Sequence, residues 1–129
     1  MPTIAGSSEA PGPHAVGEVA ARLFTRVWAR EPDGVWFAPG RVNLIGEHTD
    51  YNDGFVLPVA INFHTAVAGA VRSDDLIDVV ALDENYQRVQ FPLKASPEFD
   101  TQAFWSNYVR GVVDELQKAG YALRGANLT

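Results

Sequence analysis

The chain has 129 residues, of which 47% are hydrophobic and 20% charged, a balance typical of a folded domain and not of a disordered chain. Its formal net charge of −6 disfavours nucleic acid as a partner, because an acidic chain repels the phosphate backbone. The absence of cysteine excludes disulfides, cysteine nucleophiles and thiolate metal sites, and it fits a reducing compartment.

Residues 1–14 are rich in proline, glycine and serine, which predicts a flexible tail ahead of a single domain over residues 15–129. The tail lacks the basic start and apolar run of a signal peptide. No stretch of the chain approaches the ~20 apolar residues that a membrane span needs. We therefore expect a cytoplasmic protein with no membrane partner.

Apolar residues at helical spacing predict a first helix over Ala15–Arg30, with Glu18 in its first turn. A second helix is predicted over Thr101–Ala119, and Gly120 is well placed to end it. The chain then reaches the start of a further strand near Ala126. Between the helices, short valine-rich runs separated by turn residues predict six strands: Val35–Ala38, Arg41–Ile45, Phe55–Ile61, Thr65–Arg72, Ile77–Leu82 and Val89–Leu93.

This order of elements predicts an α+β fold, with a mostly antiparallel meander of strands and packed helices. The second helix carries one apolar stripe: Trp105, Tyr108, Val109, Val112, Leu116 and Ala119. Gly111 interrupts this helix at a cost of ~1 kcal/mol relative to alanine, which a close packing contact would explain.

The segment Ala38–Pro58 contains the polar and charged residues that are the strongest candidates for binding a ligand. Seven consecutive polar or amphipathic residues, Glu47–Asp53, lie between Gly46 and Gly54, more than a tight hairpin turn needs. The carboxylates of Glu47 and Asp50 can each bridge neighbouring sugar hydroxyls. His48 adds a group that donates or accepts, and Arg41 supplies a permanent cation. This composition suits recognition of a polyol.

Simpler interpretations of the same residues stay open. Asn52-Asp53-Gly54 alone is a plain turn, and a Glu-His pair is often a solvated surface. His48 with its two carboxylate neighbours also suggests a metal site, but no second histidine stands at ligand spacing, so we predict no metal there. His64 lies between two predicted strands and is interpreted as structural.

The segment closely resembles the galactokinase signature of the sugar kinases known as GHMP kinases. The match runs through Ala38–Arg41 and Asn43–Tyr51 to Leu57-Pro58. The stretch Trp105–Gly111 is also similar to a galactokinase helix. The resemblance covers nearly everything after the tail. It implies the N-terminal part of a GHMP-kinase domain, of the ribosomal protein S5 domain 2-like fold.

Galactokinases transfer the γ-phosphate of ATP to the C1 hydroxyl of α-D-galactose with the help of Mg²⁺. The resemblance implies that Asp50 holds hydroxyls on the C3–C4 side, and that Glu47 reaches towards the C6 hydroxyl with His48 beside it. It places Arg41 by the reacting hydroxyl, where a cation stabilises the catalytic aspartate and the transferring phosphate. Trp105 would approach the adenine of ATP, although a core aromatic explains that residue equally well.

The family's phosphate loop, of the form PxGxGLSSSA, is absent from these 129 residues, as are its catalytic aspartate and magnesium ligands. We interpret the chain as an N-terminal fragment and predict that it has no kinase activity alone. Two alternatives remain: a kinase for another sugar such as N-acetylgalactosamine or arabinose, and a non-catalytic galactose-binding or sensing protein. The oligomeric state is not predicted.

Overall fold

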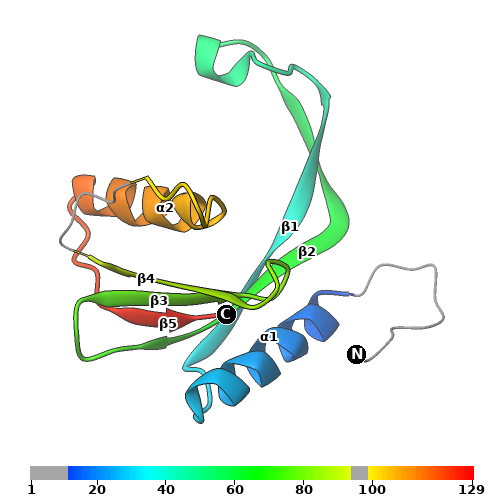
Figure 1. Cartoon of the computed structure of the whole chain (residues 1–129). Coiled ribbons are helices and arrows are strands. Elements are labelled where there is room, and N and C mark those ends of the chain that lie inside the picture. Colours follow the sequence, from blue (N-terminus) through cyan, green and yellow to red (C-terminus); the bar gives the residue numbers. More distant parts are fainter. Residues whose placement is uncertain (1–11, 94–98) are drawn as a thin grey trace.

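A computed structural model describes residues 12–93 and 99–129, which form two α-helices and a five-stranded sheet (Figure 1). The sheet order is β1-β2-β5-β3-β4, and every neighbouring pair is antiparallel except β3 with β5. The elements in chain order are α1 (Pro13–Trp28), β1 (Gly34–Ile45), β2 (Leu57–Val71), β3 (Leu76–Ala81), β4 (Gln87–Pro92), α2 (Ser106–Lys118) and β5 (Ala126–Leu128). The predicted α+β fold with a mostly antiparallel sheet is confirmed.

The predicted meander is wrong in its strand order, because β5 inserts between β2 and β3. Two pairs of predicted strands also merge into the single long strands β1 and β2. Pro39-Gly40 is not a turn but an irregularity inside β1, where the register with β2 shifts. Proline is tolerated there because β1 is an edge strand and needs no hydrogen bond on its outer side.

Helix α1 begins at Pro13, inside the predicted tail, and ends at Trp28 with Ala29 in the left-handed conformation. Proline suits the first position of a helix, since its missing N–H has no partner there anyway. Because the helix begins at Pro13, its first turn holds no acidic residue. The prediction that Glu18 lies in the first turn is therefore wrong. The rest of the predicted tail, residues 1–11, lies outside the described residues.

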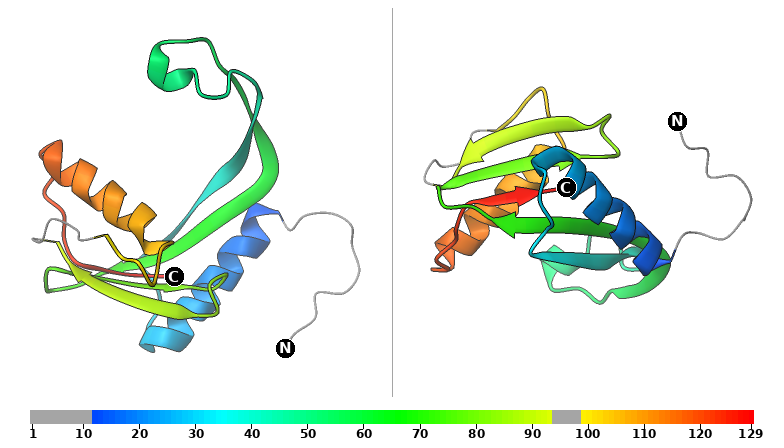
Figure 2. Two further views of the ribbon diagram at one scale, coloured as in Figure 1. Left: turned by 45° about the horizontal axis from the view of Figure 1, so that its top comes forward. Right: turned by 90° about the horizontal axis from the view of Figure 1, so that it is seen from below.

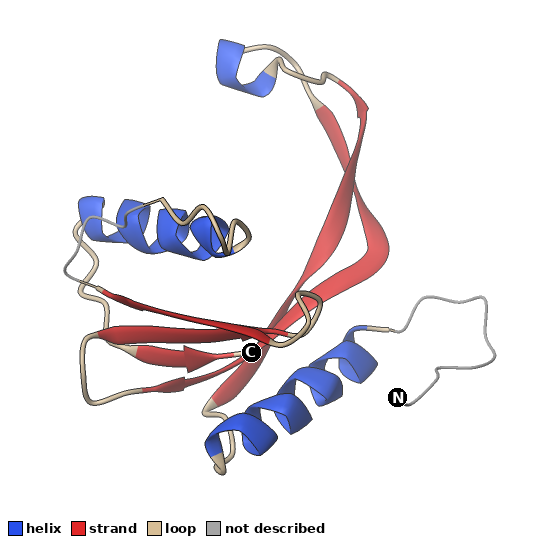
Figure 3. Cartoon of the chain, in the orientation of Figure 1, coloured by secondary structure: helices blue, strands red, loops and turns tan. Residues whose placement is uncertain are grey.

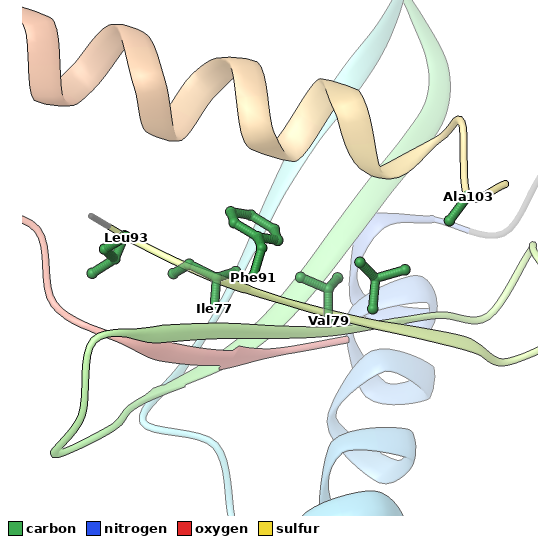
Figure 4. Close-up of a cluster of buried hydrophobic side chains, with 6 residues drawn as sticks. Ile77, Val79, Phe91, Leu93 and Ala103 are labelled. Atoms are coloured by element: carbon green, nitrogen blue, oxygen red, sulfur yellow. The ribbon is translucent and has the colours of Figure 1, made fainter. Parts of the chain in front are cut away.

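The two helices cover opposite faces of the sheet (Figures 1 and 2). Below helix α2 lies a core of buried side chains from β3, β4 and the residue after β4: Ile77, Val79, Val89, Phe91 and Leu93. Ala103, on the segment that leads into α2, completes this core (Figure 4). On the other face, α1 packs Ala20 and Phe24 against Ala68 and Ala70 of β2. The alternation of side chains along the strands divides the apolar residues between these two cores.

Helix α2 begins at Ser106, five residues later than predicted, because a turn around Asp100 replaces the first helical turn. The Asp100 carboxylate accepts hydrogen bonds from the N–H groups of Gln102 and Ala103. The predicted C-terminal glycine is confirmed: Gly120 has φ +88°, and the N–H of Tyr121 donates to the carbonyl of Leu116. This hydrogen bond closes a Schellman motif.

The residues of the predicted apolar stripe of α2 do not share one face, because some face the core and others face outwards. Trp105, Val109 and Val113 pack against the core, whereas Tyr108 and Val112 are exposed. Gly111 lies on the exposed side, where a Cβ would meet no atom within 4 Å. A close packing contact, one explanation for a glycine at this position, is therefore absent among the described residues.

Beyond the body of the sheet, β1 and β2 continue as a two-stranded ribbon (Figure 3). Strand β2 pairs with β5 only at Gly69–Val71, while its pairing with β1 runs from Gly69 back to Leu57. The ribbon carries the connecting loop, residues 46–56, away from both helices (Figures 1 and 3). The segment predicted to recognise a sugar thus forms the tip of a projecting arm.

Candidate functional site

The loop at the tip of the ribbon is held closed by Thr49. Its hydroxyl donates to the carbonyl of Gly46 at 2.6 Å and lies 3.1 Å from the carbonyl of Phe55, which joins the two ends of the loop. The carbonyl of Thr49 in turn accepts from the N–H groups of Asn52 and Gly54. Within the loop, Asp50–Asn52 form one turn of 3₁₀-helix. The polar cluster therefore has a defined shape of its own.

Three residues of this loop have positive φ: Gly46 at +101°, His48 at +59° and Asp53 at +56°. At Gly46 a Cβ would lie 2.5 Å from the carbonyl oxygen of Phe55, so only glycine fits. His48 and Asp53 carry a side chain in a conformation that disfavours one. The carbonyl of His48 accepts a hydrogen bond from the side-chain amide of Asn52 at 3.2 Å.

The structure brings Glu47, His48 and Asp50 together on this loop, and all three are exposed. Arg41 is also exposed, on β1 four residues before the strand ends, opposite Ala60 of β2. Within the described part of the chain, the side chains of Arg41, Glu47 and Asp50 make no hydrogen bond or ion pair. These charged groups are therefore available to a ligand.

His48 is different, because its Nδ1 lies 2.7 Å from the hydroxyl of Tyr51, with the two ring centroids 6.0 Å apart. The sequence interpretation gave no separate role to Tyr51, Thr49 or Asn52. The three-residue spacing from His48 to Tyr51 was the available signal, because a helical turn brings such residues together.

Trp105 lies elsewhere, at the start of α2. Its indole N–H donates to the side-chain carbonyl of Gln87 at 2.6 Å, and the ring packs partly against the core below the helix. Trp105 also lines a cavity of about 300 Å³ between α1, β2 and β3. His64 lines the same cavity, and its buried Nδ1 has no hydrogen-bond partner among the residues that the structure describes.

Over residues 12–93 and 99–129, no group of three histidine, aspartate or glutamate side chains is placed to hold a metal ion. In the same part of the chain, neither helix is long and apolar enough to cross a membrane.

Residues 22–71 match the family model described as the galactokinase galactose-binding signature. This range includes the ribbon, the loop and the four residues Arg41, Glu47, His48 and Asp50. The fold is similar to a crystal structure of Lactococcus lactis galactokinase complexed with galactose, with a TM-score of 0.72 and 33% sequence identity over 86% of this chain. The chain resembles a galactokinase in both sequence and fold.

The match spans only 29% of the Lactococcus lactis galactokinase, so the similarity covers less than a third of that enzyme. The galactokinase signature does not reach Trp105.

Proposed function

We propose that this chain is the galactose-recognising part of a galactokinase, a GHMP kinase that transfers the γ-phosphate of ATP to the C1 hydroxyl of α-D-galactose. The observation that carries the proposal is the coincidence of two independent features. The galactose-binding signature, residues 22–71, includes the loop at the tip of the ribbon, and the carboxylates of that loop are exposed and unpaired within the described residues.

In this proposal Asp50 accepts hydrogen bonds from the hydroxyls on the C3–C4 side of galactose, and Glu47 accepts one from the C6 hydroxyl beside His48. An ionised carboxylate has about four acceptor positions and no donor, so it suits neighbouring hydroxyl groups. The 3₁₀ turn that begins at Asp50 and the hydrogen bonds of Thr49 hold these groups in place before the sugar arrives. Preorganised groups lose less entropy on binding.

Arg41 acts on the reacting end of the sugar. Its guanidinium is always charged and has no partner in the described part of the chain, so it can stabilise both a catalytic aspartate and the transferring phosphate. A strand positions such a group more rigidly than a loop does. The aspartate itself is not among the residues that match the family pattern here.

ATP and Mg²⁺ belong to the complete enzyme in this proposal. The sequence contains no glycine- and serine-rich run ahead of a helix that could cradle the phosphates. Trp105, which lines the cavity between α1, β2 and β3, is the proposed contact to the adenine. An enzyme that uses ATP and a free sugar in this way fits a cytoplasmic location.

The test is a titration of the ¹⁵N-labelled chain with galactose, followed by the backbone amide signals of the loop. We expect galactose to shift these signals and glucose, its C4 epimer, to have a much weaker effect. Asp50→Asn should weaken galactose binding by roughly tenfold or more, because a charge-assisted hydrogen bond contributes about 1.5–3 kcal/mol. No galactose-dependent release of ADP is expected from this chain.

Asp53→Asn is the matched control. It removes the same charge from the same loop, and asparagine tolerates the left-handed conformation that Asp53 adopts at φ +56°. Equal binding of glucose and galactose, or equal losses in the two variants, would contradict the proposal.

A further inference from the structure

His48 and Tyr51 form a pair inside the loop whose hydrogen bond leaves one nitrogen of the imidazole free. Nδ1 of His48 lies 2.7 Å from the Tyr51 hydroxyl, and Asn52 holds the backbone carbonyl of His48. The ring and the backbone of His48 are therefore both fixed from within the loop. Nε2 is the ring atom that remains available to a ligand.

The direction of this hydrogen bond decides what Nε2 can do. A neutral imidazole has one nitrogen that donates and one that accepts. The phenolic O–H is more acidic than the N–H of a neutral imidazole, so the favoured arrangement has Tyr51 donating to Nδ1. The proton of His48 then lies on Nε2, which becomes a hydrogen-bond donor.

The two carboxylates near His48 in the loop cannot supply the hydrogen-bond donor that a sugar hydroxyl oxygen needs. Glu47 and Asp50 are carboxylates, which only accept hydrogen bonds, whereas every sugar hydroxyl oxygen also has lone pairs to satisfy. One N–H of the Asn52 side-chain amide, another donor group of the loop, is already bonded to the carbonyl of His48. A proton on Nε2 supplies a donor beside the two carboxylates.

We propose that Tyr51 is a positioning residue that fixes His48 as the Nε2–H tautomer, so that His48 donates a hydrogen bond to an oxygen of the sugar. The inference rests on the proposed function of the loop in galactose recognition. Tyr51 does not contact the sugar in this scheme. It acts through the proton position and the orientation of the His48 ring.

The test compares the wild-type chain with Tyr51→Phe, which removes only the hydroxyl. Two-bond ¹H–¹⁵N correlation spectra at mildly alkaline pH report which nitrogen of each neutral histidine carries the proton. We expect the Nε2–H pattern for His48 in the wild type and a shift towards a mixture of tautomers in Tyr51→Phe. His14 and His64 serve as internal references in the same spectra.

Tyr108→Phe is the matched control, because Tyr108 is exposed on α2 and its hydroxyl makes no hydrogen bond within the described residues. It should leave the His48 spectrum unchanged. In galactose titrations, Tyr51→Phe should weaken binding roughly threefold to tenfold, as for one neutral hydrogen bond. With 6-deoxygalactose the difference between wild type and Tyr51→Phe should shrink, since Glu47 and His48 face the C6 side.

Two results overturn the role of Tyr51 while galactose binding stays intact: the same His48 tautomer in wild type and Tyr51→Phe, or a changed tautomer with unchanged affinity. The wild-type spectrum is decisive by itself, because an Nδ1–H tautomer overturns the proposal however the variant folds. Failure of the wild-type chain to bind galactose contradicts instead the proposed function, and with it the sugar-facing role of His48.

Discussion

Asp78→Asn should destabilise the sheet far more than Asp74→Asn, although both remove one carboxylate that pairs with Arg72. The Asp78 side chain is fully buried at the centre of the sheet, whereas that of Asp74 is 46% exposed. Arg88 donates to both carboxylate oxygens of Asp78, at 2.8 and 2.6 Å, and Gln90 donates to one of them at 2.8 Å. The burial of the carboxylate is the main difference between the two variants.

The magnitude follows from the hydrogen bonds that asparagine cannot accept. Asparagine keeps one acceptor oxygen for Arg88 Nε but turns an amino group towards the second guanidinium nitrogen and the Gln90 amide. Breaking one side of a buried ion pair typically costs ~3–5 kcal/mol, and the half-exposed Arg88 can recover some hydration. We therefore expect Asp78→Asn to lower the free energy of unfolding by about 3 kcal/mol, which corresponds to a melting temperature lower by roughly 10 °C in a chain of this size.

The pH dependence gives a second signature. Burial alone would raise the pKa of Asp78, but the hydrogen bonds from Arg88 and Gln90 and the charges of Arg88 and Arg72 outweigh it, so the pKa lies below its usual value. The ionised carboxylate therefore contributes stability in full above the unfolded pKa of ~3.9, and this contribution is lost as the pH falls through the folded pKa. The difference in the free energy of unfolding between wild type and Asp78→Asn should therefore become smaller below about pH 4.

The assay is equilibrium unfolding in guanidinium chloride at pH 7 and at several acidic values, followed by tryptophan fluorescence and circular dichroism. Coincident transitions in the two signals establish that one unfolding step is measured. If Asp78→Asn lowers the free energy of unfolding at pH 7 no more than Asp74→Asn does, the reasoning about the buried network is refuted. If the difference between wild type and Asp78→Asn instead grows as the pH falls, only the pKa argument is refuted.

Two further predictions concern glycines. A Cβ at Gly125 would lie 2.8 and 2.9 Å from the backbone O and N of Leu76, which cannot move aside, so Gly125→Ala should cost about 3 kcal/mol by thermal unfolding. Gly111→Ala should instead stabilise α2 by ~1 kcal/mol, since the new methyl enters open space in a helix interior. Gly120→Ala, its control at φ +88°, should destabilise by about 1 kcal/mol. Equal effects of the last two substitutions would contradict the conformational argument.

The sequence was sufficient to predict that the candidate site residues lie together, because these residues are close in the chain. Glu47, His48 and Asp50 lie within four consecutive residues, so any fold that closes this loop brings them together. Gly46 and Gly54, which bound the polar run in the sequence, are also the points where the chain enters and leaves the compact loop. The end of α2 was predictable for the same reason, because Gly120 acts through its own backbone conformation.

The strand order could not be predicted, because it depends on contacts between distant segments. Strand β5 has three residues, Ala126–Leu128, and its place is set by pairing with Gly69–Val71 and Ile77–Val79. The sequence predicted a strand that starts near Ala126, but no local pattern indicates which strands it pairs with. The merging of two predicted strands at Pro39-Gly40 is similar, since a bulge on an edge strand uses the same residues as a turn.

The conformation of His48 bears on whether the loop is a plain turn. A plain turn places glycine or asparagine where φ is positive, because a side chain there costs roughly 1 kcal/mol. The chain has histidine at φ +59°, and it fixes that histidine with Tyr51 and Asn52. The choice of residue therefore supports a loop that has a ligand to recognise.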